Sequence, residues 1–496
     1  MAASGRAPMT GAARQDRLRA TEMSCLPPHQ NCKTVAVIGG GFTGSLFALK
    51  LAAARPSWTI ILIERDGRAG RGVAYGACGP QHILNVPVAR MEVGLNPRFA
   101  DWIRLRPAHL AEALAENGGN LDASFVPRRL FGDYLEEQVL RAMQLGRQGG
   151  IRRVHGEAMK ITATPRLVVL DDGRVLDVDI VVLATGQEAA VFPLPVKTGP
   201  NVIADPWSPG VLDAISPRQT VLLLGSGLTA VDTILSLRAR GHVGTIHIVS
   251  RHGLLPHRHH SGGSWGPVLQ PGVSPKDALR NVRAHVRKAE AQGVPWQRVF
   301  DAIRPAVAAI WNSWTIAQQS QFLRHLRAIW DVHRHRMAGR IAAVIDELVL
   351  KENVIVTAGK ILSRNNRESQ IVVTLRRRRG MTKILDVDAI VNCTGPHASV
   401  RHFTHPLLDF LLYQGLAHPD PLGLGLESED CAVRTADGVL SDWLYALGPL
   451  TRAAWWEIIA VPEIKAQVDR LVQKITNDET ATLLLSATFM DIGAGI

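Results

Sequence analysis

Cysteine is scarce in this sequence and shows no paired spacing. The chain has 496 residues and five cysteines, namely Cys25, Cys32, Cys78, Cys393 and Cys431. None of them belongs to a C-x-x-C motif, so we expect neither a disulfide framework nor a dithiol redox centre. The spacing therefore excludes a dithiol-dependent disulfide reductase, and it favours a reducing cytoplasm as the location of the protein.

Long hydrophobic runs are also missing. No stretch of about 18 or more apolar residues occurs, so we expect no membrane-spanning helix. The most apolar stretches, Val35–Ile38 and Val221–Leu224, are short and are followed by glycine, as is typical of buried parallel strands. Hydrophobic residues make up 46% of the chain, which is enough for a large core, and the length predicts two or three domains.

Acidic residues are outnumbered by basic ones. The chain has 44 acidic and 56 basic side chains and a formal net charge of +12, a balance that suits anionic ligands. The one basic run, Arg376–Arg379, lies between strand-like segments and ends at Gly380, and no nucleic-acid-binding motif accompanies it. We therefore predict an exposed hairpin tip and no nucleic-acid partner. Residues 1–32 lack periodicity, and we interpret them as a disordered or wrongly assigned leader.

A glycine-rich turn follows the first predicted strand. The strand Thr34–Ile38 leads into Gly39–Gly44, and then come a helical segment over Ser45–Ala54 and a strand over Thr59–Ile63. Gly39 permits the tight turn, Gly41 lets the backbone approach a pyrophosphate, and Gly44 lets the helix pack closely on the strand. Glu64 ends the second strand and offers its carboxylate to the ribose hydroxyls. These features, with Phe42 and Thr43 beside them, predict a dinucleotide-binding unit.

The same arrangement recurs in the middle of the chain. The strand Val221–Leu224 leads into Gly225-Ser226-Gly227-Leu228-Thr229-Ala230, followed by a helical segment over Val231–Arg240 and a strand over Thr245–Val249. We expect Gly225, Gly227, Leu228 and Thr229 to contact a second dinucleotide. This strand ends in Ser250 and Arg251, which favour the 2′-phosphate of NADPH, with NADH as the alternative. Arg251 as a solvated surface side chain is the other interpretation.

Two apolar segments, Ile180–Gly186 and Ala389–Gly395, both close in Thr-Gly. They resemble the paired linker strands of two-dinucleotide flavoproteins. We therefore predict an α/β fold with two Rossmann-like domains, the second inserted in the first, and expect Gly186 and Gly395 near the cofactors. The predicted ranges are 33–190 and 388–496 for the FAD-binding domain and 191–387 for the NAD(P)-binding domain.

Residues of about 275–350 show a helical pattern and are predicted to form an insertion in the second domain. The insertion carries four tryptophans, Trp296, Trp311, Trp314 and Trp330. Core packing and a substrate cage are both open interpretations of these side chains. We also predict a helical cover over the active-site cleft as one role of the segment.

Several motifs together resemble the bacterial FAD-NAD(P)-binding protein family over roughly residues 33–475. They are Arg71–Tyr75, His82–Pro87, Pro127–Leu135, Asp205–Trp207, Ser250–Pro256, Trp330–Met337, Gly448–Arg452, Trp456–Ile458 and Ala460–Ile464. The layout is more distantly similar to flavin-containing and N-hydroxylating monooxygenases. The resemblance implies FAD and a nicotinamide cofactor, and it places Arg71 and Gly72 at the cofactor.

The late motif departs from the usual flavoprotein pattern, because Gly448 is followed by Pro449 where an aspartate is common. FAD binding at this end is then expected to depend on backbone N–H groups and the following helix. We predict that Trp456 and Glu457 lie at the start of that helix, whose dipole stabilises reduced flavin.

These observations predict an NADPH-dependent FAD oxidoreductase, with a monooxygenase acting on a small amine-bearing or anionic molecule favoured. The alternatives are an NAD(P)H dehydrogenase that passes electrons to an external acceptor and a non-catalytic flavin-binding redox sensor. Asn85 and His82 are the catalytic candidates, because flavin monooxygenases carry an active-site asparagine in a comparable segment. Asn85 as a turn residue before Pro87, and His82 as a packed side chain, are the competing interpretations. The F-x-G-x-x-x-H motif of related monooxygenases is absent from residues 187–207.

A histidine-rich loop contains His257, His259 and His260 but no nearby cysteine or carboxylate. We interpret it as a solvent-facing loop near the nicotinamide and predict no metal site. The sequence leaves the state of oligomerisation open.

Overall fold

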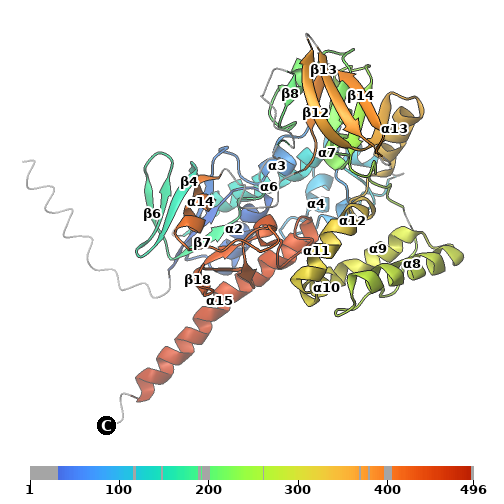
Figure 1. The fold of residues 1–496 in the computed structure, drawn as a ribbon. Helices are drawn as coiled ribbons and strands as arrows, with labels where there is room; N and C mark the ends of the chain where they lie inside the picture. The colour runs from blue at the N-terminus through green and yellow to red at the C-terminus, as the bar shows by residue number, and fades with distance from the viewer. Residues whose placement is uncertain are drawn as a thin grey trace, which may run out of the picture.

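The computed structural model describes residues 32–115, 119–146, 149–187, 192, 201–260, 262–367, 370–377, 380–395 and 405–492, without the side chains of 478–492. The predicted leader lies outside these ranges except for Cys32, and so do Cys25 and two arginines of the basic run. Within the described part, the chain folds into two units built on parallel sheets and a group of helices beside them (Figure 1).

The first unit is built on a seven-stranded sheet with the order β16-β17-β18-β7-β1-β2-β3. Its strands are β1 (Thr34–Ile38), β2 (Thr59–Glu64), β3 (Gly150–His155), β7 (Ile180–Leu183), β16 (Ser428–Glu429), β17 (Ala432–Arg434) and β18 (Leu440–Ala446). The five strands β18, β7, β1, β2 and β3 are parallel to one another, whereas β16 and β17 form an antiparallel edge beside β18. The central strands are apolar at almost every position because both faces of the sheet are covered.

Different elements cover the two faces of this sheet. Val35 and Val37 pack against α2 (Phe42–Ala54), α6 (Arg128–Leu145) and α15 (Val461–Ile492). Ala36 and Ile38 point to the other face, as alternation along a strand requires. This face is covered by α14 (Pro406–Tyr413) and by a three-stranded sheet of β4 (Ala158–Ala163), β5 (Arg166–Leu170) and β6 (Val175–Asp177).

The second unit repeats this plan on a five-stranded parallel sheet with the order β11-β10-β9-β15-β8. Its strands are β8 (Val202–Ile203), β9 (Val221–Leu224), β10 (Ile246–Ser250), β11 (Val354–Ala358) and β15 (Ala389–Asn392). Helices α7 (Leu228–Ala239) and α13 (Gly339–Leu350) cover one face. An antiparallel sheet of β12 (Lys360–Arg367), β13 (Gln370–Arg376) and β14 (Thr382–Val387) covers the other.

The chain passes from the first unit to the second after β7 and returns to pair β18 with β7, so the second unit is inserted in the first, as predicted. The predicted return at residue 388 is wrong, because β15 pairs with β8 and β9 of the second sheet. The predicted hairpin is confirmed: β13 and β14 pair antiparallel, and the described residues Arg376, Arg377 and Gly380 are exposed.

The predicted helical insertion consists of α8 (Pro275–Ala291), α9 (Trp296–Ile303), α10 (Val307–Ser313), α11 (Ile316–His325) and α12 (Arg327–Arg334). These helices share a core of their own, to which Leu424 and Trp456 of the first unit also belong. The predicted end at residue 350 is too late, because Ile341, Ala342 and Ile345 of α13 pack on the second sheet. In Figure 1 the helices α8–α12 lie beside α15 and below the second unit.

Three short α-helices and a 3-10 turn lie in the described part of the first unit between β2 and α6. They are α3 (Gly72–Gly76), a 3-10 turn at Val88–Arg90, α4 (Phe99–Arg104) and α5 (Pro107–Leu114). Among the described residues, none of the helices has both the length and the apolar character that crossing a membrane requires.

Candidate dinucleotide sites and the contacts between them

The first glycine turn is closely packed. Gly39 has a φ of +102°, and a Cβ atom there would lie 2.4 Å from the carbonyl oxygen of Ala184. A Cβ atom on Gly44 would lie 1.9 Å from the carbonyl oxygen of Gly39, so only glycine lets α2 approach β1 this closely. Gly41 precedes α2 directly and faces Gly72, whose Cα atom lies 3.4 Å from the position of a Cβ on Gly41. Phe42 and Thr43 are buried in the first turn of α2.

Glu64 lies at the carboxyl end of β2, next to this turn. Its side chain is 8% exposed, and its Oε2 accepts a hydrogen bond of 2.7 Å from the N–H of Gly40. Its Oε1 accepts a second bond of 3.0 Å from the N–H of Asp66. The carboxylate is therefore held in a fixed position beside the glycine turn.

Arg71 lies beside the turn, but carboxylates already bind its guanidinium. It donates to Asp133 and, at 2.9 Å, to Glu136, both on α6. Its side chain is 12% exposed. Arg71 thus fixes the segment that covers Gly41, with Gly72 directly against that glycine.

The second glycine turn has the same geometry but a more open surface. Gly225 has a φ of +101°, and a Cβ there would lie 2.3 Å from the carbonyl oxygen of Cys393. A Cβ on Gly227 would meet no atom of the described residues within 4 Å, and Leu228 and Thr229, which begin α7, are half-buried. Gly186 and Gly395 follow β7 and β15 at equivalent places, with φ values of +77° and +81°.

Ser250 and Arg251 lie at the carboxyl end of β10, beside the second turn. The Oγ of Ser226 in that turn lies 2.8 Å from the Oγ of Ser250, which also accepts from the N–H of Gly253 at 3.0 Å. Arg251 is exposed. The two predicted contacts for a 2′-phosphate are thus adjacent to the turn, one of them anchored and the other in solvent.

The segment after β18 reaches back to the first turn. Gly448 has a φ of +68°, and a Cβ there would lie 3.1 Å from the Oγ1 of Thr43. The N–H of Gly448 donates to the Oε1 of Gln467 on α15 at 2.8 Å. Sequences that are far apart therefore meet at the amino end of α2.

Trp456 and Glu457 do not lie at the start of the C-terminal helix, because α15 begins at Val461. They contact the helical insertion instead. The Trp456 ring stacks on Trp311 with centroids 4.8 Å apart, and Glu457 accepts a hydrogen bond of 2.7 Å from the Nε1 of Trp330. Both are buried, with exposures of 2% and 6%. The predicted effect of a helix dipole on the flavin does not apply to these two residues.

His82 joins the two units. It is 4% exposed, its Nδ1 accepts from the N–H of Gly79 at 3.0 Å, and its Nε2 lies 2.7 Å from the Oγ of Ser236 on α7. Burial lowers the pKa of His82, although Asp232 opposes the shift. Arg128 reinforces this contact with an ion pair of 2.8 Å to Asp232. Both ring nitrogens of His82 are therefore engaged in contacts within the protein.

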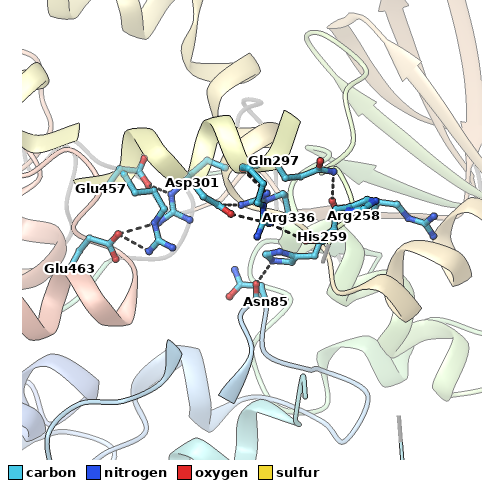
Figure 2. A network of polar contacts seen from close by, with 12 residues as sticks. Asn85, Arg258, His259, Gln297, Asp301, Arg336, Glu457 and Glu463 are labelled. Atoms are coloured by element: carbon cyan, nitrogen blue, oxygen red, sulfur yellow. Dashed lines mark hydrogen bonds and ion pairs between the residues drawn. The ribbon is translucent and has the colours of Figure 1, made fainter. Parts of the chain in front are cut away.

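Asn85 makes the second contact between the units. Its carbonyl oxygen lies 2.7 Å from the Nε2 of His259, in the loop after β10 (Figure 2). Burial lowers the pKa of His259 to about 4, so the ring is neutral at pH 7 and donates this hydrogen bond. The interpretation of this histidine loop as solvent-facing is wrong for His259, whereas His257 and His260 are exposed.

A buried network of charges extends from this contact into the helical insertion (Figure 2). Asp301 on α9 pairs with Arg336, which is 2% exposed, and at 2.9 Å with Arg298. Burial favours the protonated acid, but the two arginines hold the pKa of Asp301 below its usual value. The network could not be found from the sequence, because its members are separated along the chain and look like ordinary charged helix positions.

The network continues to the C-terminal part of the first unit. Arg334 on α12 lies 3.1 Å from Glu457 and 3.4 Å from Glu463, and Arg304 lies 2.8 Å from Glu463. These ion pairs attach the helical insertion to the segment before α15 and to its first turn. The insertion is therefore bound to the first unit although it lies within the sequence of the second.

In the described part of the chain, no group of three or more histidine, cysteine, aspartate or glutamate side chains has the geometry of a metal site. Cys32, Cys78, Cys393 and Cys431 are free thiols, and the last two are buried.

Residues 36–188 match a protein family described as FAD-NAD(P)-binding. The predicted resemblance is thereby confirmed for this segment. An uncharacterised protein of Mycobacterium tuberculosis is 23% identical over 512 aligned positions, which cover 89% of this chain and 95% of the relative.

Two solved structures extend the comparison to the whole fold. The ornithine N-hydroxylase of Kutzneria sp. 744 has a TM-score of 0.62 at 16% identity. The superposition covers 90% of this chain and 100% of the hydroxylase chain. The cadaverine monooxygenase of Erwinia amylovora, solved with FAD bound, has a TM-score of 0.63 at 12% identity and covers 90% of this chain and 95% of its own. They confirm the predicted α/β fold.

Proposed function

We propose that this protein is an NADPH-dependent FAD monooxygenase that acts on a small molecule. The observation that carries the proposal is the pair of complete dinucleotide turns, at Gly39–Gly44 and Gly225–Ala230, in two units that contact each other through His82 and Asn85. The two turns therefore lie in units that contact each other directly, so a reductant bound at one turn and a flavin bound at the other would be held in the same protein. FAD, when bound, accepts electrons from NADPH and activates oxygen for transfer to the substrate.

The residues of the first turn fit FAD. Side chains are excluded at Gly39 and Gly44, which leaves the N–H groups at the start of α2 accessible to a pyrophosphate. Glu64 would bind the adenosine ribose from the end of β2. Gly448, which lies against Thr43, would bind the other end of the cofactor through backbone groups.

The second turn fits NADPH in the same way, with Gly225 and Gly227 at the pyrophosphate. Ser250 and Arg251 stand where an acid would select NADH. Because Arg251 is exposed and positively charged, it is free to move onto a 2′-phosphate.

Two arguments favour oxygenation over electron transfer to a disulfide or another acceptor. The sequence has no C-x-x-C motif, so a dithiol relay has no chemical basis in this chain. Two solved structures with the same fold are an ornithine N-hydroxylase and a cadaverine monooxygenase, both named for amine substrates. A small amine-bearing substrate is therefore our first choice.

We assign different roles to the two catalytic candidates. His82 is a positioning residue, because both of its ring nitrogens are used in contacts within the protein. Asn85 is the better candidate for a group that touches the flavin or the substrate, since His259 holds its backbone and leaves its side-chain amide available.

The test is a product assay on purified, FAD-loaded protein. NADPH oxidation, oxygen consumption and hydrogen peroxide are measured together with a panel of small amines, and products are analysed by mass spectrometry. We expect an amine that gains one oxygen atom per NADPH oxidised and lowers the peroxide yield. Efficient reduction of the flavin with transfer only to dyes or quinones would overturn the assignment in favour of a reductase. Failure of both nicotinamide cofactors to reduce the flavin would indicate a redox sensor.

The same assay tests Asn85. We expect Asn85→Ala to keep the rate of flavin reduction and to raise the share of NADPH that ends as peroxide. An unchanged product yield would remove Asn85 from the catalytic residues.

A further inference from the structure

Arg452 differs from the other deeply buried arginines in having no acidic partner among the described residues. Arg334, at 6% exposure, pairs with Glu457 and Glu463, and Arg336, at 2%, pairs with Asp301. Arg452 is also 6% exposed, yet no described carboxylate forms an ion pair with its guanidinium, and its Nε, like those of Arg334 and Arg336, has no hydrogen-bond acceptor among the described residues.

The carboxylates near Arg452 are already engaged. Glu457 binds Arg334 and Trp330, and Asp331 lies 3.5 Å from Arg327. The Arg452 guanidinium instead lies over the Trp456 ring, whose centroid is 4.4 Å away. A cation–π contact offsets part of the desolvation of a guanidinium, but a buried cation without an anion is strongly disfavoured. An anion from outside the chain would complete the site.

Trp456 also forms part of the wall of a cavity inside the helical insertion. The cavity has a volume of about 90 Å³, and every side chain that lines it is apolar or aromatic. Its aromatic lining consists of Phe300, Trp311, Trp314, Phe322, Trp330 and Trp456. A cavity of this lining and size suits an aromatic ring or a short alkyl chain.

We propose that the cavity and Arg452 form one binding site for a small hydrophobic carboxylic acid. The apolar end of the acid occupies the cavity, and its carboxylate binds the Arg452 guanidinium beside Trp456. Both parts of the site share Trp456, which places the charge and the apolar space within the width of one indole of each other. The proposal goes beyond the monooxygenase assignment and depends on neither glycine turn, so each can fail without the other.

The test is calorimetric titration of FAD-loaded protein with phenylacetate, phenylacetamide and acetate. We expect saturable binding of phenylacetate, with quenching of tryptophan fluorescence. Phenylacetamide should bind at least about tenfold more weakly, because it lacks the charge that Arg452 requires. Acetate, which has no group to fill the cavity, should not bind in the same range. Equal affinity for phenylacetate and phenylacetamide, or no saturable binding of phenylacetate, would overturn the proposal.

Three variants separate the two halves of the site. Arg452→Met should weaken phenylacetate about tenfold or more and abolish its advantage over phenylacetamide. Ala278→Leu, which adds bulk to the cavity wall, should weaken both ligands alike. Arg470→Met is the matched control, since Arg470 also lies over a tryptophan ring, that of Trp455 at 5.8 Å, but pairs with Asp430 and does not line the cavity. It should change the affinity less than about twofold.

Two further measurements keep the result interpretable. The ligand-free Arg452→Met protein should be at least as thermally stable as the wild type, because it loses a buried charge without a partner. It should also keep its full content of FAD. A marked fall in melting temperature would show that Arg452 holds the structure together, and loss of FAD would assign Arg452 to the cofactor. Either result would overturn the proposed carboxylate site.

Discussion

The two dinucleotide units share one framework and differ in how their glycine turns are covered. In the first unit, the segment at Gly70–Gly72 lies over the turn, and the N–H of Gly70 donates to the carbonyl of Gly40 at 2.7 Å. Gly41 faces Gly72, whereas Gly227 in the second unit faces open space among the described residues. The first turn is thus closed by the protein and the second remains accessible.

The difference fits the proposed assignment of the two cofactors. A flavin stays bound through many turnovers, and a turn covered by its own chain would keep it in place. A nicotinamide cofactor must enter and leave in each cycle, and an open turn with an exposed Arg251 permits exchange. A small difference in the segment that covers the same kind of turn can therefore decide whether a cofactor stays bound or exchanges.

The largest effect is expected from adding one methyl group to the closed turn. In Gly44→Ala the new Cβ would lie 1.9 Å from the carbonyl oxygen of Gly39, so α2 must move away from β1. We expect a loss of about 3 kcal/mol of stability and of most bound FAD, measured by thermal unfolding and by flavin absorbance. Gly227→Ala adds the same methyl group to the open turn, at the position that corresponds to Gly41 and has no described atom within 4 Å, and it should leave both quantities unchanged. Equal losses in the two variants would show that the close contact at Gly44 is not the cause.

The contact between the units gives the next effect. Arg128→Met leaves Asp232, which is 8% exposed, without its partner, and we expect a loss of about 3 kcal/mol because an unpaired buried charge is costly. The neighbouring Arg129 pairs with Glu112 at a more exposed position, with side-chain exposures of 34% and 36%. Arg129→Met should therefore cost less than about 1 kcal/mol. Calorimetric melting of the FAD-loaded proteins measures the loss of stability in both variants. Similar losses would show that the ion pair between the units contributes no more to stability than an exposed ion pair.

His259 makes the same interface sensitive to acid. Its folded pKa of about 4 lies below the usual value of 6.5, so the unfolded chain takes up the proton first as the pH falls. The stability that neutral His259 contributes is complete above about pH 6.5 and is lost as the pH falls toward about 4, by up to about 3 kcal/mol.

We expect His259→Gln to reduce the slope of stability against pH in this window, measured by urea unfolding at successive pH values. The exposed His252 supplies the control, because His252→Gln should leave the slope unchanged. A wild-type slope in His259→Gln would show that the acid sensitivity arises elsewhere.

The smallest effect concerns the choice of reductant at the open turn. Arg251→Glu should lower kcat/KM for NADPH by about tenfold or more, since the new charge repels a 2′-phosphate, and should change the value for NADH little. Arg377→Glu, at the exposed hairpin, controls for the loss of positive charge in general. Steady-state kinetics with both cofactors decide the matter, and equal changes for NADPH and NADH would remove Arg251 from the 2′-phosphate site.

The sequence predicted those features that depend on neighbouring residues. The strand Thr34–Ile38 has the predicted bounds, and both glycine turns lie where strand, glycine spacing and helix indicated. Features that depend on distant partners were not predictable. The segment Ala389–Gly395 looks like Ile180–Gly186, but the sheet that accepts each strand is decided by pairing and not by local pattern.

The buried charges show the same limit. Arg334 and Glu463 are ordinary charged residues of helical segments when the sequence is considered alone. Only the packing of α12 against the start of α15 brings them together, at 3.4 Å. Arg452 closes the segment Gly448–Arg452 noted in the sequence, but its lack of an acidic partner among the described residues is a property of three-dimensional packing.

In the sequence, the helical insertion lies between β10 and α13. Both of these elements belong to the second unit, so the chain leaves that unit and returns to it. The five helices of the insertion share a core that contains no residue of either glycine turn. The chain is consequently modular in an evolutionary sense: the segment that forms the cavity can lengthen, shrink or change its lining in descendants while the cofactor machinery is inherited intact. Relatives of this protein are then expected to diverge first in the cavity-lining residues of α8–α11, whereas residues that pair with the first unit, such as Arg334, are constrained. Exchange of the cavity-lining residues is then the natural route to engineered variants with new ligand preferences.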